Sequence, residues 1–78
     1  MTTEKKLKLM NLFVNDLWKL IKETEPMDVA SNDTWDILIS KTSEMAKNYP
    51  EIADYVEVIC TAHLDYKERE YKKCSLRN

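Results

Sequence analysis

The sequence predicts an all-α fold, a single domain of residues 1–78 that forms an up-down-up three-helix bundle. The chain has no glycine and two prolines in 78 residues, whereas sheets with tight hairpins usually need glycine at positive φ. Its composition is 44 % apolar and 33 % charged, typical of a folded globular domain. Apolar residues recur every three or four positions in three segments, near 4–24, 33–47 and 50–73.

The first helix is expected near residues 4–24, with Thr3 as its N-cap. It should end at about Glu25, because the residue before Pro26 avoids the α conformation. Its inner stripe consists of Met10, Phe13, Val14, Leu17, Leu20, Ile21 and Thr24, flanked by Leu7 and Trp18.

The second helix is expected near 33–47, after a connection that contains no glycine. We predict Asp33 as its N-cap, because Asp36 follows in the position of a capping-box acid. Its inner stripe consists of Trp35, Leu38, Thr42, Met45, Ala46 and Tyr49. Pro50 forces a sharp break, so the second and third helices should form an antiparallel hairpin.

The third helix, near 50–73, is the element around which the rest of the chain is expected to pack. Pro50 suits the first turn of a helix, and about 24 residues give a rod of roughly 36 Å. Its inner stripe consists of Ile52, Tyr55, Val56, Ile59, His63, Tyr66 and Glu70. The tail, residues 75–78, is expected to fray.

Five residues are expected to be largely buried, namely Trp18, Trp35, Leu38, Val56 and Ile59. Replacing Ile59 with Ala should therefore cost about 2–5 kcal/mol.

The formal net charge of −2 is unevenly distributed along the chain. Residues 1–8 and 67–78 are basic, whereas residues 23–57 hold nine acidic residues and two lysines. In an up-down-up bundle the two basic segments lie at opposite ends of the molecule. A nucleic-acid partner is therefore not expected, because it needs one continuous basic surface.

Cys60 and Cys74 are expected to be ordinary thiols. On one helix their separation of fourteen positions is roughly 21 Å, beyond the limit of about 7 Å for a disulfide. Cys60 and His63 lie one turn apart, but two further zinc ligands are lacking, so neither a metal site nor a cofactor is predicted. We expect a structural His63, hydrogen-bonded near the end of the bundle. The sequence leaves the roles of all three residues open.

The sequence shows no arrangement of catalytic residues, so we do not expect an enzyme. No cysteine–histidine pair has a recognisable third group that would orient it, and a small bundle has no evident cleft. No apolar run approaches the length of a membrane span, and no export signal is visible. A cytoplasmic protein is the resulting expectation.

A strip on the first helix is the candidate interaction site, because a three-helix core cannot easily reach it. Its residues are Leu9, Leu12, Asp16, Lys19 and Leu20. Through this strip the protein would form a homodimer or bind its partner, and Asp16 and Lys19 could pair across a symmetry axis.

Three segments carry a resemblance to known proteins. They are residues 33–39 (Asp-Thr-Trp-Asp-Ile-Leu-Ile), Glu44 with Asn48-Tyr49, and residues 62–72 (Ala-His-Leu-Asp-Tyr-Lys-Glu-Arg-Glu-Tyr-Lys). This pattern resembles a group of short uncharacterised helical proteins of prophages and conjugative elements in low-GC Gram-positive bacteria. The resemblance implies a mobile-element origin and no particular chemistry.

The function expected from these observations is that of a small non-enzymatic accessory or adaptor protein that binds another protein. An alternative is an acidic inhibitor that occupies a basic, nucleic-acid-binding surface of a host protein. A third is a nucleic-acid-binding regulator, which a fold that joined the two basic ends would favour.

Overall fold

The structure, a computed structural model, describes the backbone of residues 1–77 and the side chains of residues 1–74. It contains three α-helices and one short 3₁₀ turn, and the described residues form no strand. In chain order these are α1 (Thr3–Thr24), α2 (Asn32–Asn48), η1 (Pro50–Ile52) and α3 (Ala53–Arg77). The prediction of an all-α three-helix bundle is confirmed.

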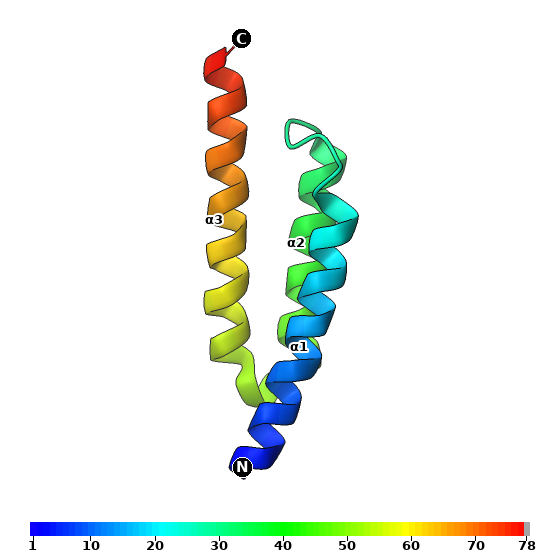
Figure 1. Cartoon of the computed structure of the whole chain (residues 1–78), viewed down its shortest axis with the longest axis vertical. Helices are drawn as coiled ribbons and strands as arrows, with labels where there is room; N and C mark the ends of the chain where they lie inside the picture. The colour runs from blue at the N-terminus through cyan, green and yellow to red at the C-terminus, as the bar shows by residue number, and fades with distance from the viewer. Residues whose placement is uncertain (78) are drawn as a thin grey trace.

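The helices lie side by side in an elongated molecule with extents of 51 × 17 × 16 Å. α1 and α3 run in the same direction and α2 runs back between their ends (Figure 1). α2 packs closely against both neighbours, whereas the backbones of α1 and α3 approach each other less. The helices are therefore packed less tightly on the side of the molecule where α1 faces α3 than on the sides that α2 forms with its two neighbours.

Both long N-terminal helices begin earlier than the sequence predicted. Thr2, not Thr3, caps α1, and its hydroxyl accepts a hydrogen bond of 3.2 Å from the backbone N–H of Lys5. Ser31, not Asp33, caps α2. A turn places Ser31 there, because its N–H donates to the Asp28 carbonyl at 3.0 Å, and its hydroxyl then accepts from the Asp33 N–H at 3.2 Å.

The break between the second and third helices lies where Pro50 predicted it. Tyr49 ends α2 with φ −125° and ψ 59°, and Pro50 opens η1. α3 continues to Arg77, so the backbone of residues 75–77 is helical in the segment expected to fray. Asn78 lies outside the described residues.

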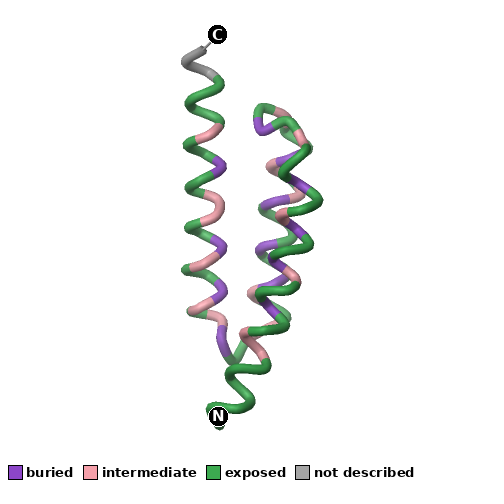
Figure 2. Tube along the Cα trace, viewed as in Figure 1, coloured by how far each residue is buried: buried purple, intermediate pink, exposed green. Residues whose placement is uncertain are grey.

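The core lies where α2 meets the other two helices, and Figure 2 shows buried positions on the facing sides of all three. Its buried cluster consists of Phe13, Leu17, Leu20, Leu38, Met45, Ile52, Val56 and Cys60. Leu38 and Val56 are completely buried, as predicted. Trp35 and Ile59 are only partly buried. The prediction for Trp18 is wrong: it is 56 % exposed, because it lies on the less tightly closed side of α1.

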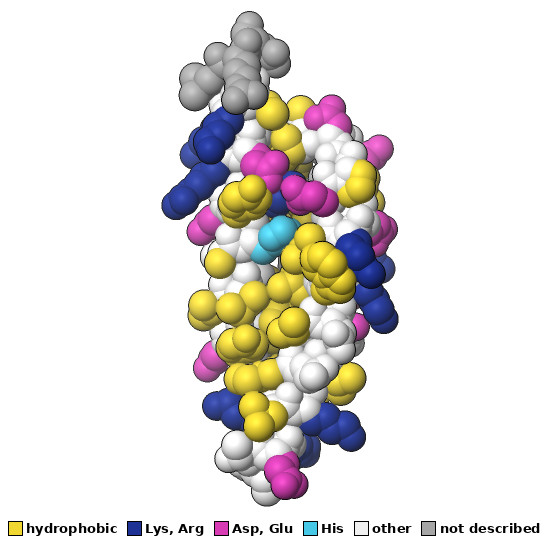
Figure 3. Space-filling model, in the orientation of Figure 1, with side chains coloured by type: hydrophobic (Ala, Val, Ile, Leu, Met, Phe, Trp, Pro, Cys, Tyr) yellow, Lys and Arg dark blue, Asp and Glu magenta, His cyan; other side chains and the backbone are white. Residues whose placement is uncertain are grey.

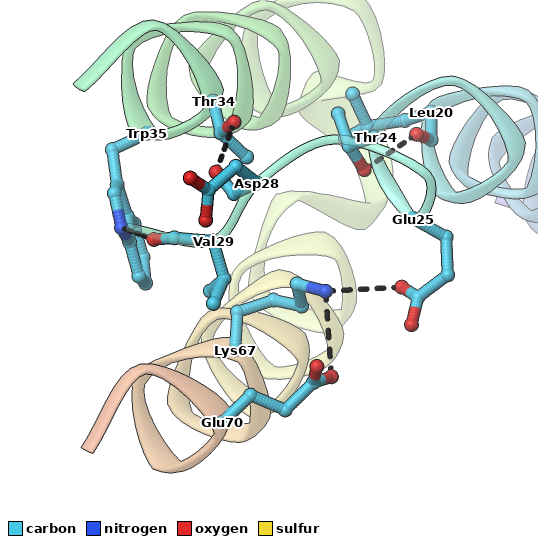
Figure 4. A network of polar contacts seen from close by, with 9 residues as sticks. All are labelled: Leu20, Thr24, Glu25, Asp28, Val29, Thr34, Trp35, Lys67 and Glu70. Atoms are coloured by element: carbon cyan, nitrogen blue, oxygen red, sulfur yellow. Dashed lines mark hydrogen bonds and ion pairs between the residues drawn. The ribbon is translucent and has the colours of Figure 1, made fainter. Parts of the chain in front are cut away.

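Trp35 has a different role from the one predicted, because it holds the connection between α1 and α2. Its indole N–H donates to the Val29 carbonyl at 2.8 Å, and the neighbouring Thr34 hydroxyl donates to the Asp28 carbonyl at 2.7 Å (Figure 4). The side chain of Val29, which belongs to this connection, is buried. A connection without glycine is thus fixed by side chains at the start of α2.

Candidate interaction surface

An apolar surface lies along the less tightly closed side of the bundle, and we call it the α1–α3 face. Its members are Met10, Val14, Trp18 and Ile21 of α1 and Tyr55, Ile59 and Tyr66 of α3. Figure 3 shows hydrophobic side chains gathered along the side formed by these two helices.

On α1, the face follows from residue spacing. Val14, Trp18 and Ile21 succeed one another at intervals of four and three residues, so they share one flank of the helix. Glu25 continues the same line by four residues, and its carboxylate contacts Lys67 of α3. The flank that carries Trp18 is therefore the flank directed toward α3.

On α3, Tyr55 anchors the other border of the face. Its ring meets Phe13 of α1 edge to face, with centroids 5.8 Å apart. Ile59 and Tyr66 lie four and eleven residues further on and so occupy the same flank of α3. Tyr66 is 56 % exposed, although the sequence placed it on the inner stripe. In this turn of α3 the buried residue is Lys67, and not Tyr66 as the sequence predicted, so the buried side of the helix is shifted by one residue.

The middle of the face is about half exposed to solvent. Val14 is 47 % exposed and Trp18 is 56 % exposed. The Lys22 ammonium lies 5.7 Å from the centroid of the Trp18 ring, a cation–π arrangement that orients the indole. Large apolar side chains that are half exposed and contiguous are typical of binding surfaces.

An ion-pair cluster around the buried Lys67 closes one end of the face. Lys67 is 1 % exposed, and its Nζ donates to Glu25 Oε2 at 3.1 Å and to Glu70 Oε1 at 3.3 Å (Figure 4). Burial alone lowers the Lys67 pKa, but the hydrogen bonds and charges of the two carboxylates outweigh burial, so the pKa is raised. The cluster carries two negative charges and one positive charge, a net charge of −1.

Sequence reasoning missed Lys67 as a buried residue, because lysine is almost never buried unless it is paired. A signal was present in its spacing. Lys67 lies seven residues after Cys60 and eleven after Val56, so it continues the line of the core residues.

His63 lies one turn before Lys67 and is partly buried. Its Nε2 atom is buried and has no hydrogen-bond partner among the residues that the structure describes, so the expectation of a hydrogen-bonded histidine is not met at this atom. Burial lowers the His63 pKa, the Lys67 charge lowers it further, and the charges of Glu25 and Glu70 act in the opposite direction. A neutral imidazole therefore fits this position.

The other end of the face widens into a hollow between the start of α1 and the start of α3. Lys6, Met10, Asp54 and Tyr55 are among the residues that line it. Met10 and Tyr55 belong to the face, so the hollow continues it. One end of the α1–α3 face thus carries the ion-pair cluster of Lys67, and the other carries a hollow lined by both Lys6 and Asp54.

The interaction strip predicted from the sequence is divided by the structure. Leu20 is a core residue and Leu9 packs against the core. Asp16 accepts a hydrogen bond from the Tyr49 hydroxyl, which ties it to the end of α2. Leu12 and Lys19 remain exposed. The strip lies on the opposite flank of α1 from Trp18, and its role in binding stays a prediction.

Tyr49, at the end of α2, contacts α1 on that opposite flank. The hydrogen bond to Asp16, together with burial and the charge of Asp16, raises the pKa of Tyr49 to about 12. Its ring also meets Phe13 edge to face, with centroids 6.1 Å apart.

The two cysteines do not form a disulfide. Cys60 belongs to the core, where burial raises the pKa of its thiol, and Cys74 is exposed. A buried thiol with a raised pKa is a weak nucleophile. Within the described part of the chain, no three His, Cys, Asp or Glu side chains gather in a way that could hold a metal ion.

Comparison with known proteins gives one partial similarity. No family model matches the chain, and no solved structure matches it. The chain is 34 % identical over 59 residues to glutamate–tRNA ligase 1 of Sulfurovum sp. (strain NBC37-1). The match covers 76 % of this chain but 13 % of the ligase, so the chain spans a small part of that enzyme's length.

None of the described helices combines the length and the apolar character that crossing a bilayer requires.

Proposed function

We propose that the protein is a small non-enzymatic accessory or adaptor protein that binds another protein through the α1–α3 face. The observation that carries this proposal is the half exposure of Val14, Trp18 and Tyr66 on the α1–α3 face. Figure 3 shows hydrophobic side chains along this side of the molecule, with the histidine among them. Apolar surface of this kind is costly to leave in water. Trp and Tyr are also the residues most often found at the energetic centre of protein interfaces.

An amphipathic helix is the partner shape that this surface suits. The side-chain ridge of a further helix can pack between the ridges of two roughly parallel helices such as α1 and α3. Such a helix would present apolar residues at intervals of three and four to Trp18 and Tyr66. Glu25 and Glu70 each leave one carboxylate oxygen outside the hydrogen bonds to Lys67, so a basic residue on the partner could bind at that end.

The similarity to glutamate–tRNA ligase 1 does not extend this proposal to a ligase activity, since the chain spans 13 % of that enzyme. A mobile-element origin and a cytoplasmic location remain predictions from the sequence.

A second candidate function is inhibition of a protein that has a basic, nucleic-acid-binding surface. It is favoured by the acidic residues Asp33 and Asp36, which are exposed and share one flank of α2. Glu44 lies on the same flank, where it is paired with Lys41 at 3.8 Å. Such a stripe could imitate the charge of a phosphate backbone. A nucleic-acid-binding regulator is not favoured, because the basic start of α1 and the basic end of α3 lie at opposite ends of a 51 Å molecule (Figure 1).

An affinity capture from a Gram-positive bacterial lysate, run at low and high salt, tests both candidates. We expect the adaptor to retain a partner at high salt and to lose it on Val14→Glu, which places a charge in the face. Val58→Glu is the matched control, because Val58 is 67 % exposed and lies on the outer side of α3. Capture that survives Val14→Glu but disappears at high salt, or on an Asp33→Lys, Asp36→Lys double variant, would instead support the inhibitor.

A further inference from the structure

We propose that His63 is a pH-sensitive switch at the Lys67 end of the α1–α3 face: a proton on its imidazole releases residues 63–74 of α3 from Glu25, while the rest of the bundle stays folded. The switch acts in the free protein. It therefore goes beyond the proposed function, and its test needs no partner.

The surroundings of the Nε2 atom of His63 make a proton costly there. This atom is buried and has no hydrogen-bond partner among the described residues. A neutral imidazole can leave one ring nitrogen without a proton, whereas both nitrogens of an imidazolium are N–H donors. Protonation thus buries a donor that lacks an acceptor. It also adds a positive charge one turn from Lys67, which is itself buried.

Three charged groups act on His63, namely Lys67 and Glu70 of α3 and Glu25 at the end of α1. Within the described part of the chain, no charged group of α2 acts on it. Burial and the Lys67 charge outweigh the two carboxylates, so the pKa of His63 is lowered. The thiol of Cys60, one turn earlier, stays neutral because burial raises its pKa. Both carboxylates already accept hydrogen bonds from Lys67, at 3.1 Å and 3.3 Å, so an imidazolium gains one only at the expense of Lys67.

Few other contacts hold this part of α3, so its release can stay local. Cys60 is the last apolar core residue of α3 in the part of the chain that the structure describes, and Leu64 is only partly buried against that core. Residues 68–74 are exposed, apart from the partly buried Glu70. The connection between α1 and α2 is held by a hydrogen bond of Trp35 that does not involve α3 (Figure 4). Proteins commonly open such weakly held segments without global unfolding.

The direction of the pH dependence follows from the lowered pKa. The closed end favours a neutral His63, whereas in the open end the imidazole is hydrated and returns to its ordinary pKa of 6.5. The ratio of open to closed molecules should therefore rise as the pH falls from 6.5 through the lowered pKa, by at most about tenfold per pH unit for one proton. Once released, a short helical segment without tertiary contacts is marginal in water and frays.

Native-state hydrogen exchange, followed by NMR, tests the switch. After correction for intrinsic exchange rates, we expect protection of the amides of residues 64–71 to fall about tenfold between pH 7.5 and pH 5. This exchange should depend little on urea, because the opening exposes little surface, whereas exchange of core amides such as that of Leu38 should depend on urea strongly. The chain has one histidine, so its imidazole protons report the titration directly. We expect a pKa below 6.5 in the folded protein and a return to the ordinary value in urea.

Two variants separate the switch from a general effect of acid. His63→Gln keeps a polar side chain and all three charged neighbours, so protection of residues 64–71 should be the same at both pH values. Lys67→Met removes the competing ammonium and frees Glu25 and Glu70 for the imidazolium, so acid should no longer lower protection there. Circular dichroism checks that both variants are folded, and the titration of wild type needs neither. A fall that persists in either variant overturns the proposal. So does a wild type whose His63 titrates at or above 6.5, or whose residues 64–71 exchange only with the full urea dependence of the core.

Discussion

The Nζ atom of Lys67 lies 3.1 Å from Oε2 of Glu25, and this ion pair joins α3 to the end of α1. The two helices approach each other less closely than either approaches α2. The pair therefore fixes their spacing at one end of the α1–α3 face, and Tyr55 against Phe13 does so toward the other end.

Replacing Lys67 with Ala should lower the free energy of unfolding by about 2–3 kcal/mol, mainly through lost packing of the buried alkyl chain. Lys67→Met keeps most of that packing, so its cost should be under about 1.5 kcal/mol. The carboxylates can tolerate the loss of the ammonium, since the Glu25 side chain is 49 % exposed and can rehydrate. Urea unfolding of both variants measures the difference. Equal costs for Ala and Met would show that the charge, and not the alkyl chain, stabilises the contact.

His63 should make the fold sensitive to acid. Its pKa in the fold lies below the ordinary value of 6.5, so the unfolded chain takes up a proton first as the pH falls. Stability is then lost as the pH falls from about 6.5 through the folded pKa. His63→Gln should remove this loss, so its stability relative to wild type should be higher at pH 5 than at pH 8. His63→Leu should also stabilise the fold by about 1 kcal/mol at neutral pH, because it removes an unpaired buried Nε2. Urea unfolding at the two pH values tests both; a wild type and a His63→Gln variant with parallel pH profiles would contradict the first.

Tyr49 should ionise well above the ordinary tyrosine pKa of 10.0. Its pKa is raised to about 12 by the hydrogen bond to Asp16. Because the folded pKa is raised, the stability from this contact is complete below pH 10 and is lost as the pH rises toward 12. An absorbance titration of the phenolate should show one late group. Asp16→Asn should return that group toward its ordinary pKa of 10.0, and an unchanged titration would show that burial alone sets it.

The positions of the three helices could be predicted from the sequence because strong local signals fix them. Pro26 and Pro50 each interrupt a helical pattern, and the bounds agree with the structure to within a few residues. The caps were less predictable, since Ser31, Asn32 and Asp33 all suit an N-cap and only the turn from Asp28 selects Ser31.

The orientation of the helices was harder to predict, because periodicity reveals an apolar flank but not which neighbour covers it. On α3, Tyr66 and Lys67 are adjacent, and hydrophobicity favours Tyr66 as the inner residue. The structure buries Lys67, because Glu25 of a distant segment supplies its partner. On α1 the wide apolar arc includes Trp18, which a third helix would bury only if it packed more closely. The α1–α3 face was therefore outside the reach of the sequence pattern.

Leu38 and Ile59 should differ in their contributions to stability. Leu38 is completely buried, so Leu38→Ala should cost about 2–5 kcal/mol through lost contacts and the cavity that remains. Ile59 is only partly buried, so Ile59→Ala should cost less than the 2–5 kcal/mol expected for a core position. Urea unfolding of the two variants tests the ranking. An equal or greater cost for Ile59 would show that the α1–α3 face is covered in solution.

The two tryptophans should differ in their contribution to stability and in their exposure to solvent. Trp18→Ala should change the free energy of unfolding by less than about 1 kcal/mol in dilute protein, because the side chain is 56 % exposed. Trp35→Ala should cost about 2–4 kcal/mol, since it removes the ring and the hydrogen bond that holds the Val29 carbonyl. Fluorescence distinguishes the two residues directly: a Trp35→Phe variant reports on Trp18 alone, and a Trp18→Phe variant on Trp35 alone. In dilute protein, acrylamide should quench Trp18 more strongly than Trp35. Stronger quenching of Trp35, or equal quenching of both residues, would contradict the exposure of Trp18.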